Sequence, residues 1–463
     1  MTFPLTKDEW YMRRDDRTKR VDGASGFEGF SIGVTVSPIV KTSFSTQVMT
    51  ITTLNMLARW CRKIVINMPD VTPNFPGLHC ASLRDKLKQD LLAIDPFGQF
   101  DFREINAQEL SQTLLIGASE QAIPEASNCL WIDGANWVAG IGSGKDVQTI
   151  EMDGTLNPTG PAFASCLGVA ELFRQAMGLP ASLTKPVWYS MYDYTKVSNP
   201  KDAKTGVFMP DFDFGRIHQV GCGAVGSSLD FLLSLTDWKA NLDLIDYDKV
   251  EISNCNRSLT FSAYDAVTNT NKVDACANVL KGNINALKFN GSYGDFVNTG
   301  KFVDSPPDLI LCLANEQNIW STIQNNIPPL TFHATTTPNW AINFGRHIPK
   351  KEWCILCRFS QEVQHQFKPV CAEGEIKPAS KGYDTIMGVL PFLSTTAAVL
   401  ILAEMAKLPL PKYPMNKDFV EFSTHIIGSD FQQLQMQADE GCDCNKQPLL
   451  PHLIKSKFWD LSC

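Results

Sequence analysis

The residues best suited to chemistry lie between positions 214 and 272, around a glycine-rich loop. Glycines permit a tight turn and let backbone N–H groups approach a phosphate, and a helix that begins at such a loop points its positive end at that phosphate. Asp246 follows about 20 residues past the glycines, where a carboxylate can hold a ribose hydroxyl. These residues predict a nucleotide site, although such loops serve many cofactors. The loop consists of Gly221, Cys222, Gly223, Ala224, Val225 and Gly226.

Charged residues beyond the loop narrow the choice of nucleotide. Asp248 closely follows Asp246, and Asn254, Arg257 and Lys272 come next in the chain. A dinucleotide carries two phosphates, which the helix terminus already satisfies. An additional arginine and lysine suit a triphosphate, whose β and γ phosphates need neutralising as they leave. The pattern favours ATP, and an NAD-dependent oxidoreductase is the weakest alternative.

In these residues the chain resembles the ubiquitin-activating enzymes and their bacterial relatives, the adenylyltransferases that activate the sulfur carriers of molybdopterin and thiazole synthesis. The glycine loop, the Asp-x-Asp strand end, the Ser-Asn-x-x-Arg segment and the lysine occur in the family's order. The resemblance implies that ATP and Mg²⁺ bind here, and that the C-terminal carboxylate of a ubiquitin-like protein, usually ending in glycine, is adenylated. It implies phosphate contacts for Asn254, Arg257 and Lys272. The implied nucleotide-binding residues also include the loop, Asp246, Asp248 and Asn315.

One position departs from the family's pattern. Where the family has the aspartate that holds Mg²⁺, this chain has Ala314, which cannot coordinate a metal. Glu316 and Asp248 are candidates to replace it, unless the alignment is shifted by a residue or two. The same departure supports an alternative, in which the chain is a non-catalytic regulatory subunit of an activating complex.

Two cysteine pairs predict a structural zinc site. Cys354 and Cys357 form a Cys-x-x-Cys knuckle, and Cys442 and Cys444 form a tighter Cys-x-Cys pair. Four thiolates from two hairpins give a closed tetrahedral site that fastens a segment to its domain. A knuckle alone would equally suit redox chemistry. The sulfur-carrier activators also have a structural zinc here, but their pairs are both Cys-x-x-Cys.

Cys371 is the candidate nucleophile. It lies in a Cys-Ala-Glu segment after the first cysteine pair, and Gly374 and Gly382 favour a flexible loop around it. In the family this segment belongs to a loop that crosses over the nucleotide site, expected here at about residues 358–384. The resemblance implies that Cys371 takes the activated carboxyl from AMP as a thioester. The alternatives are a zinc ligand or a buried thiol.

The elements that position these residues predict an α/β protein with a Rossmann-like mixed sheet in an adenylation domain, residues 213–463. Residues 216–220 and 242–245 are expected strands, with a helix between them. The order strand, loop, helix, strand recurs within residues 29–180. There Pro38, Lys41 and Thr42 replace the glycines. Because proline has no N–H and side chains block close approach, this half is a degenerate domain that should not bind ATP.

Two further segments complete the predicted organisation. Residues 1–28 form a basic arm that is either solvated or, as the resemblance implies, brings an arginine to the ATP site of a partner subunit. Arg17 and Arg14 are the candidates for that catalytic contact. Residues 181–212 are rich in prolines and turns, and they are expected to connect the two halves.

Composition sets the broad class. The chain has 463 residues, 44 % of them hydrophobic, and a net charge of −8, which argues against nucleic-acid binding. No secretory signal or membrane span is visible, so a cytoplasmic enzyme is expected. The resemblance implies transfer from Cys371 to a ubiquitin-conjugating-type enzyme, as in a compact bacterial ubiquitin-activating homologue of an antiviral conjugation operon. A sulfur-carrier or peptide adenylyltransferase remains an alternative, and homodimerisation is left open.

Overall fold

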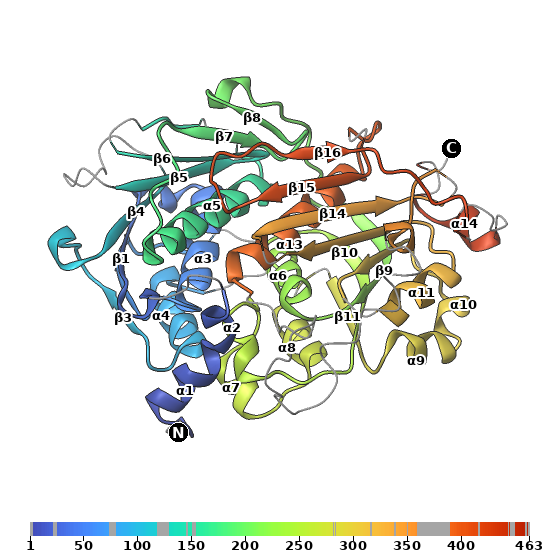
Figure 1. Cartoon of the computed structure of the whole chain (residues 1–463), viewed down its shortest axis with the longest axis horizontal. Coiled ribbons are helices and arrows are strands. Elements are labelled where there is room, and N and C mark those ends of the chain that lie inside the picture. Colours follow the sequence, from blue (N-terminus) through green and yellow to red (C-terminus); the bar gives the residue numbers. More distant parts are fainter. Residues whose placement is uncertain are drawn as a thin grey trace.

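Two mixed sheets of eight strands each dominate the described part of the computed structural model (Figure 1). The structure describes residues 3–21, 26–73, 80–117, 129–144, 147–150, 154–280, 282, 284–314, 317–337, 339–349, 351–358, 389–414, 417–442, 444, 450–458 and 461. Among these residues, no helix combines the length and the apolar character that crossing a membrane requires.

The first sheet has the strand order β3-β2-β1-β4-β5-β6-β7-β8. Its strands are β1 (Ser31–Val36), β2 (Lys63–Asn67), β3 (Gln99–Phe102), β4 (Gln112–Ile116), β5 (Leu130–Ala135), β6 (Val138–Ser143), β7 (Val187–Ser190) and β8 (Thr195–Val197). Its helices are α1 (Lys7–Arg14), α2 (Asp16–Lys19), α3 (Phe44–Ala58), α4 (Leu83–Ile94) and α5 (Thr159–Ala176). Strands β3 to β5 pair in parallel, and β5 to β8 pair antiparallel.

The second sheet has the order β11-β10-β9-β12-β13-β14-β15-β16. Its strands are β9 (Asp213–Val220), β10 (Lys239–Asp246), β11 (Ile284–Asn290), β12 (Leu309–Cys312), β13 (Thr331–Thr336), β14 (Ala341–His347), β15 (Phe419–Ser423) and β16 (Gln432–Leu434). Its helices are α6 (Ala224–Leu233), α7 (Ala263–Val267), α8 (Lys272–Val279), α9 (Tyr293–Asn298), α10 (Lys301–Asp304), α11 (Gln317–Asn325), α13 (Pro391–Lys407) and α14 (Pro451–Lys455).

The two sheets repeat one topology. Strands β9 to β16 occupy the same places in the second sheet as β1 to β8 do in the first, and they pair with their neighbours in the same parallel or antiparallel sense. Helix α13 packs against both α6 and α5, and α5 packs against α3, so these helices join the sheets at the centre of the molecule (Figure 1). The predicted fold class, two paired Rossmann-like mixed sheets, is therefore confirmed.

The helix that follows the first strand has a side-chain cap at its N-terminus in the first half of the chain but not in the second. Between β1 and α3, Pro38–Lys41 form a 3₁₀ helix, and the Ser43 hydroxyl accepts a hydrogen bond from the Thr46 amide at 3.1 Å. Ser43 thereby caps α3 with its own side chain. In the second half the N-cap of α6 is Gly223, which has no side chain to offer. This difference supports the interpretation that only the second half receives a phosphate.

The prediction that residues 1–28 form a solvated arm is wrong for those of them that the structure describes. Helix α1 packs into the fold, with Trp10 fully buried, and the Trp10 indole donates to Asp95 at 3.1 Å. The Arg14 guanidinium is also fully buried, and it forms ion pairs of 2.6 Å with both Asp15 and Asp95. Since breaking a buried ion pair costs several kcal/mol, about 3–5, Arg14 is not available to reach an ATP site.

The segment predicted to connect the halves contributes secondary structure of its own. Strands β7 and β8 lie within residues 181–212 and complete one edge of the first sheet. The Tyr189 hydroxyl donates to the Ser429 carbonyl at 3.0 Å, and Lys196 donates to the Gly428 carbonyl at 2.7 Å. We propose that the first unit extends through Val197, with only the residues after it acting as a connector.

Candidate nucleotide site and zinc knuckle

The glycine loop follows β9 and leads directly into α6. Gly221 has a φ of +106°, and a Cβ placed there would lie 2.9 Å from the Ala314 amide nitrogen. A Cβ on Gly226 would lie 2.2 Å from the Gly221 carbonyl oxygen. Both positions therefore require glycine. A Cβ on Gly223 would meet nothing within 4 Å, so the loop presents open backbone at the N-terminus of α6, where the helix dipole favours an anion.

Asp246 and Asp248 lie at the carboxyl end of β10, beside this loop. The Asp246 carboxylate accepts hydrogen bonds from the Cys222 amide at 2.7 Å and from the Asp248 amide at 2.8 Å. It therefore anchors the glycine loop to the neighbouring strand, and its burial raises its pKa. Lys272, the first residue of α8, forms an ion pair of 2.6 Å with Asp248. The structure thus brings the loop, both aspartates and the lysine together.

Asn254 and Arg257 lie in a segment of residues 252–261, called the Arg257 segment below. The Asn254 side chain accepts from the Glu251 amide at 3.0 Å and closes the 3₁₀ helix Ile252–Asn254. The Arg257 guanidinium donates to the side-chain oxygen of Asn256 at 2.7 Å. The Arg257 carbonyl accepts from the hydroxyl of Ser394, near the start of α13, at 3.0 Å. The segment is thus shaped by its own side chains and by α13.

Asn256 is a site residue that the sequence did not suggest. It is fully buried, and its amide donates to Thr18 of α2 at 3.0 Å and to the Val389 carbonyl at 3.1 Å. The one feature of the sequence that could have indicated it is its position between Asn254 and Arg257. Because Thr18 follows Arg17, the structure places Arg17 close to the Arg257 segment of the same chain, where it is half-buried. The predicted contact of Arg17 with ATP stays a prediction.

The position of the missing metal ligand lies directly against the glycine loop. Ala314 follows β12 by two residues, its amide faces Gly221, and its carbonyl accepts from the Trp320 indole at 3.0 Å. Asn315 and Glu316 lie outside the described residues, as does Cys371 with most of the expected crossover loop. Their assignments stay predictions.

A buried polar group lies beneath the loop. The ligand-type atoms of Cys222, Asp230 and Cys276 all lie within 4.8 Å of one another, and all three side chains are buried. Gln219 donates to Asp230 at 3.0 Å. Burial raises the pKa of the Asp230 carboxyl from 3.8 to about 7. A carboxyl group that is protonated near neutrality can remain in this apolar setting without a charged partner.

The four predicted zinc ligands come together between β14 and the segment after β16. The Sγ atoms of Cys354 and Cys357 lie 3.7 Å apart, and the pairs Cys354–Cys442 and Cys357–Cys444 are each separated by 3.5 Å. Zn–S bonds of about 2.3 Å in a tetrahedron place the sulfurs about 3.8 Å apart. The four thiols therefore fit one zinc ion, which would fasten the C-terminal segment to the sheet.

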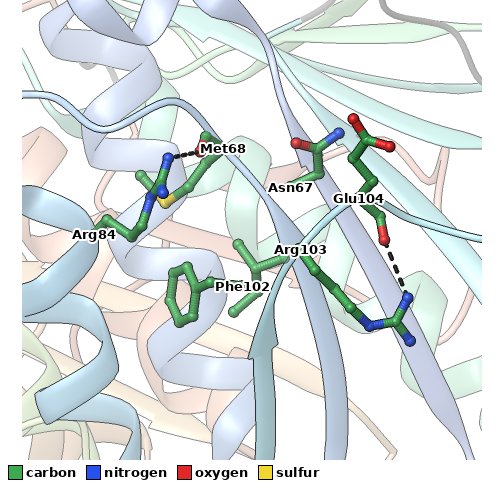
Figure 2. Close-up of a pocket in the computed structure, with 7 residues that line it drawn as sticks. Asn67, Met68, Arg84, Phe102, Arg103 and Glu104 are labelled. Atoms are coloured by element: carbon green, nitrogen blue, oxygen red, sulfur yellow. Dashed lines mark hydrogen bonds between the residues drawn. The ribbon is translucent and has the colours of Figure 1, made fainter.

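A small cavity in the first half holds none of the predicted site residues. Figure 2 shows it at the carboxyl ends of β2 and β3. Arg84 donates to the Met68 carbonyl at 2.8 Å, and Arg103 donates to the Glu104 carbonyl at 3.2 Å. By the shared topology, this edge corresponds to the edge at which Asp246 lies in the second half. The other lining residues are Ile66, Asn67 and Phe102.

The fold, together with the family match to residues 212–445, places the chain in the adenylyltransferase class. A family model described as the ThiF family matches residues 212–445, and one described as the BilD N-terminal domain matches residues 31–191. The chain belongs to the ThiF family.

Several solved structures resemble the chain. They include E. coli MccB with MccA-N7isoASN (19 % identity, TM-score 0.37, 50 % of this chain and 67 % of that chain covered). A second is E. coli MccB with succinimide, at 16 % identity and a TM-score of 0.36, with 68 % of this chain and 97 % of that chain covered. A third is PaaA, at 17 % identity and a TM-score of 0.35, with 48 % of this chain and 72 % of that chain covered. No curated protein sequence matches the chain.

We expect Asp230→Asn to change how stability depends on pH. Because the folded pKa lies above the unfolded one, the folded chain retains a proton that the unfolded chain releases, so this group lowers stability as pH rises from about 4 to 7. The difference in free energy of unfolding between the variant and the wild type should therefore shift by up to about 4 kcal/mol in favour of the variant between pH 4 and pH 8. Urea unfolding across this range measures it. The exposed carboxylate variant Asp211→Asn is the control, and parallel profiles for wild type and Asp230→Asn would contradict the prediction.

We expect the purified chain to carry about one zinc ion, because four close thiolates form a closed site. Cys444→Ser should lose the metal and lower the unfolding temperature, since metal binding contributes to folding. Elemental analysis after dialysis measures the content. Cys80→Ser, at a half-buried thiol in the first half, should keep its zinc. Equal zinc contents in the two variants would show that Cys444 is not a ligand.

Proposed function

We propose that this chain activates the C-terminal carboxylate of a ubiquitin-like protein by adenylation, and that it then carries the protein as a thioester on Cys371. Membership of the ThiF family supports the adenylation step. The match of residues 31–191 to the BilD N-terminal domain supports a conjugation system as the setting. One observation carries the proposal: the uncapped N-terminus of α6 adjoins the Lys272–Asp248 pair at the edge formed by β9 and β10.

The residues at this edge suit each part of ATP. The backbone of the glycine loop and the dipole of α6 would hold the phosphates. Asp246 would accept from the ribose while it keeps the loop in place. Lys272 and Arg257 would neutralise the charge that develops on the leaving pyrophosphate. Mg²⁺, when bound, would neutralise further phosphate charge, and Asp248 is the carboxylate at this strand end that could hold it.

The proposed reaction needs no general base. An oxygen of the substrate carboxylate forms a bond to the α-phosphorus, and the bond from that phosphorus to the bridging oxygen breaks, releasing pyrophosphate. The Cys371 sulfur then forms a bond to the acyl carbon, AMP leaves, and the thiol proton goes to solvent. A conjugating-type enzyme would receive the acyl group on its own cysteine.

The residues on either side of the segment that contains Cys371 are compatible with this role. Arg358 ends the zinc knuckle, and the carbonyl of Val389 accepts a hydrogen bond from Asn256. The chain that carries Cys371 thus leaves at the zinc knuckle and returns beside the Arg257 segment.

Ala314 favours the alternative of a regulatory subunit, because no carboxylate lies at the described end of β12.

Pyrophosphate exchange tests the adenylation step. With ATP, Mg²⁺ and a ubiquitin-like protein ending in glycine, we expect exchange that falls by about 100-fold or more in Arg257→Ala and Lys272→Ala, because each removes charge stabilisation from the transition state. Arg103→Ala, which alters the cavity of the first half, should leave exchange unchanged. Absence of exchange in the wild type with any such partner would favour the regulatory-subunit alternative.

A second measurement tests the thioester. After incubation with ATP and the ubiquitin-like protein, we expect an adduct that a reducing agent removes and that Cys371→Ala does not form. Pyrophosphate exchange should persist in this variant, because adenylation precedes the attack of the thiol. Cys80→Ala should form the adduct normally. An adduct that survives Cys371→Ala would place the nucleophile elsewhere or restrict the enzyme to adenylation.

A further inference from the structure

A buried arginine of the degenerate half reaches across to the Arg257 segment. Arg59 follows α3 as its C-cap, and none of its side chain is exposed. Its guanidinium donates to the carbonyls of Leu259 at 2.7 Å, Cys255 at 2.8 Å and Phe261 at 3.2 Å. It also donates to the Asn55 side chain at 2.9 Å. Three of these acceptors belong to the other half of the chain.

The bonding of Arg59 is unusual for a buried charge. Among the residues that the structure describes, no carboxylate forms an ion pair with it, and burial lowers its pKa to about 9. Burying a charge without a counter-ion is costly unless several hydrogen bonds compensate it. Here the compensating acceptors are the backbone carbonyls of one segment, so the charge depends on that segment keeping its shape.

The reverse dependence also holds. The acceptor residues Cys255, Leu259 and Phe261 are buried, at 0 %, 3 % and 1 % exposure. Each of their carbonyls would lose a hydrogen-bond partner if Arg59 were removed, and leaving a buried acceptor without a partner is costly. A guanidinium presents its N–H groups in one rigid plane. It therefore sets the positions of three carbonyls relative to one another, and these carbonyls bracket Arg257 in the chain.

We propose that Arg59 is a positioning residue through which the degenerate half builds the active half's phosphate-binding segment. Asn55 assists by donating to the Leu259 carbonyl at 3.1 Å, and Thr18 accepts from Asn256. Within the second half, Ser394 and the Val389 carbonyl hold the same segment. This inference rests on the proposed function, in which Arg257 neutralises the leaving pyrophosphate. The first half thus serves the reaction without binding a nucleotide.

The chain offers a matched control in Arg174 of α5. This arginine is 5 % exposed and also donates to a carbonyl of the other half, that of His425, but it does so away from the Arg257 segment. Arg59→Met and Arg174→Met each remove one buried guanidinium that bonds across the halves, to three carbonyls in the case of Arg59 and to one in the case of Arg174. Both should lower the unfolding temperature, so a purely structural effect would appear in both.

The test compares these variants by amide hydrogen exchange and by ATP–pyrophosphate exchange. In Arg59→Met, we expect faster hydrogen exchange within residues 252–261 and a fall of about 100-fold in kcat, as a displaced catalytic group gives, with KM for ATP changed little. Arg174→Met should keep wild-type protection in that segment and wild-type kcat. Arg59→Lys should recover part of the loss, because an ammonium can still donate to one or two of the carbonyls. Asn55→Ala, a milder change, should show a smaller effect of the same kind if Arg59→Met fails to fold.

Each outcome decides a separate point. Equal protection of residues 252–261 in Arg59→Met and Arg174→Met, or the same kcat in both, overturns the inference about Arg59. An inactive wild type overturns the proposed function, and the inference with it, even if the segment loses protection selectively in Arg59→Met. Selective loss of protection together with a selective fall in kcat supports both.

Discussion

The steric contact between the ends of β9 and β12 governs the nucleotide site. Gly221 has no room for a Cβ because the backbone of Leu313 and Ala314 lies against it. This contact turns the chain sharply enough for α6 to begin at the loop with its amides open. In the first half the corresponding close approach is arranged differently. There Gly117, after β4, has the positive φ of +74°, and it lies near the side chains of Ser37 and Thr46. One topology thus yields an open helix terminus in one half and a capped terminus in the other.

Much of the fold could be predicted because its signals are local. The strands expected at residues 216–220 and 242–245 lie within β9 and β10, and the helix expected between them is α6, since hydrophobic patterning within one element determines each of them. The glycine loop and the four cysteines were identifiable for the same reason. Strands β7 and β8 were missed because prolines and turns surround them, and they are strands only because β7 pairs with β6 and β8 pairs with β7.

Long-range polar contacts were beyond the reach of the sequence. The charges of residues 1–28 indicated a solvated arm, but one of the two ion-pair partners of Arg14 is Asp95, which lies 81 positions away in the sequence. The acceptors of Arg59 lie about 200 positions away and are backbone carbonyls, which any residue type supplies. A charge whose partner is backbone leaves no trace in composition or spacing. Arg59 was therefore indistinguishable from a solvated arginine after a helix.

The buried contacts suggest why a half without a phosphate loop remains joined to one that has it. The aromatic core runs through both halves. The ring centroid of Phe173 in α5 lies 5.9 Å from that of Trp340 and 5.8 Å from that of Phe392. Apolar burial of this kind is non-directional and tolerates small shifts. The guanidinium of Arg59 is directional, because each N–H must meet a carbonyl. Apolar packing can therefore hold the halves together, whereas the position of the Arg257 segment depends on a few hydrogen bonds. Loss of those bonds would leave a folded protein in which Arg257, the proposed phosphate contact, is displaced.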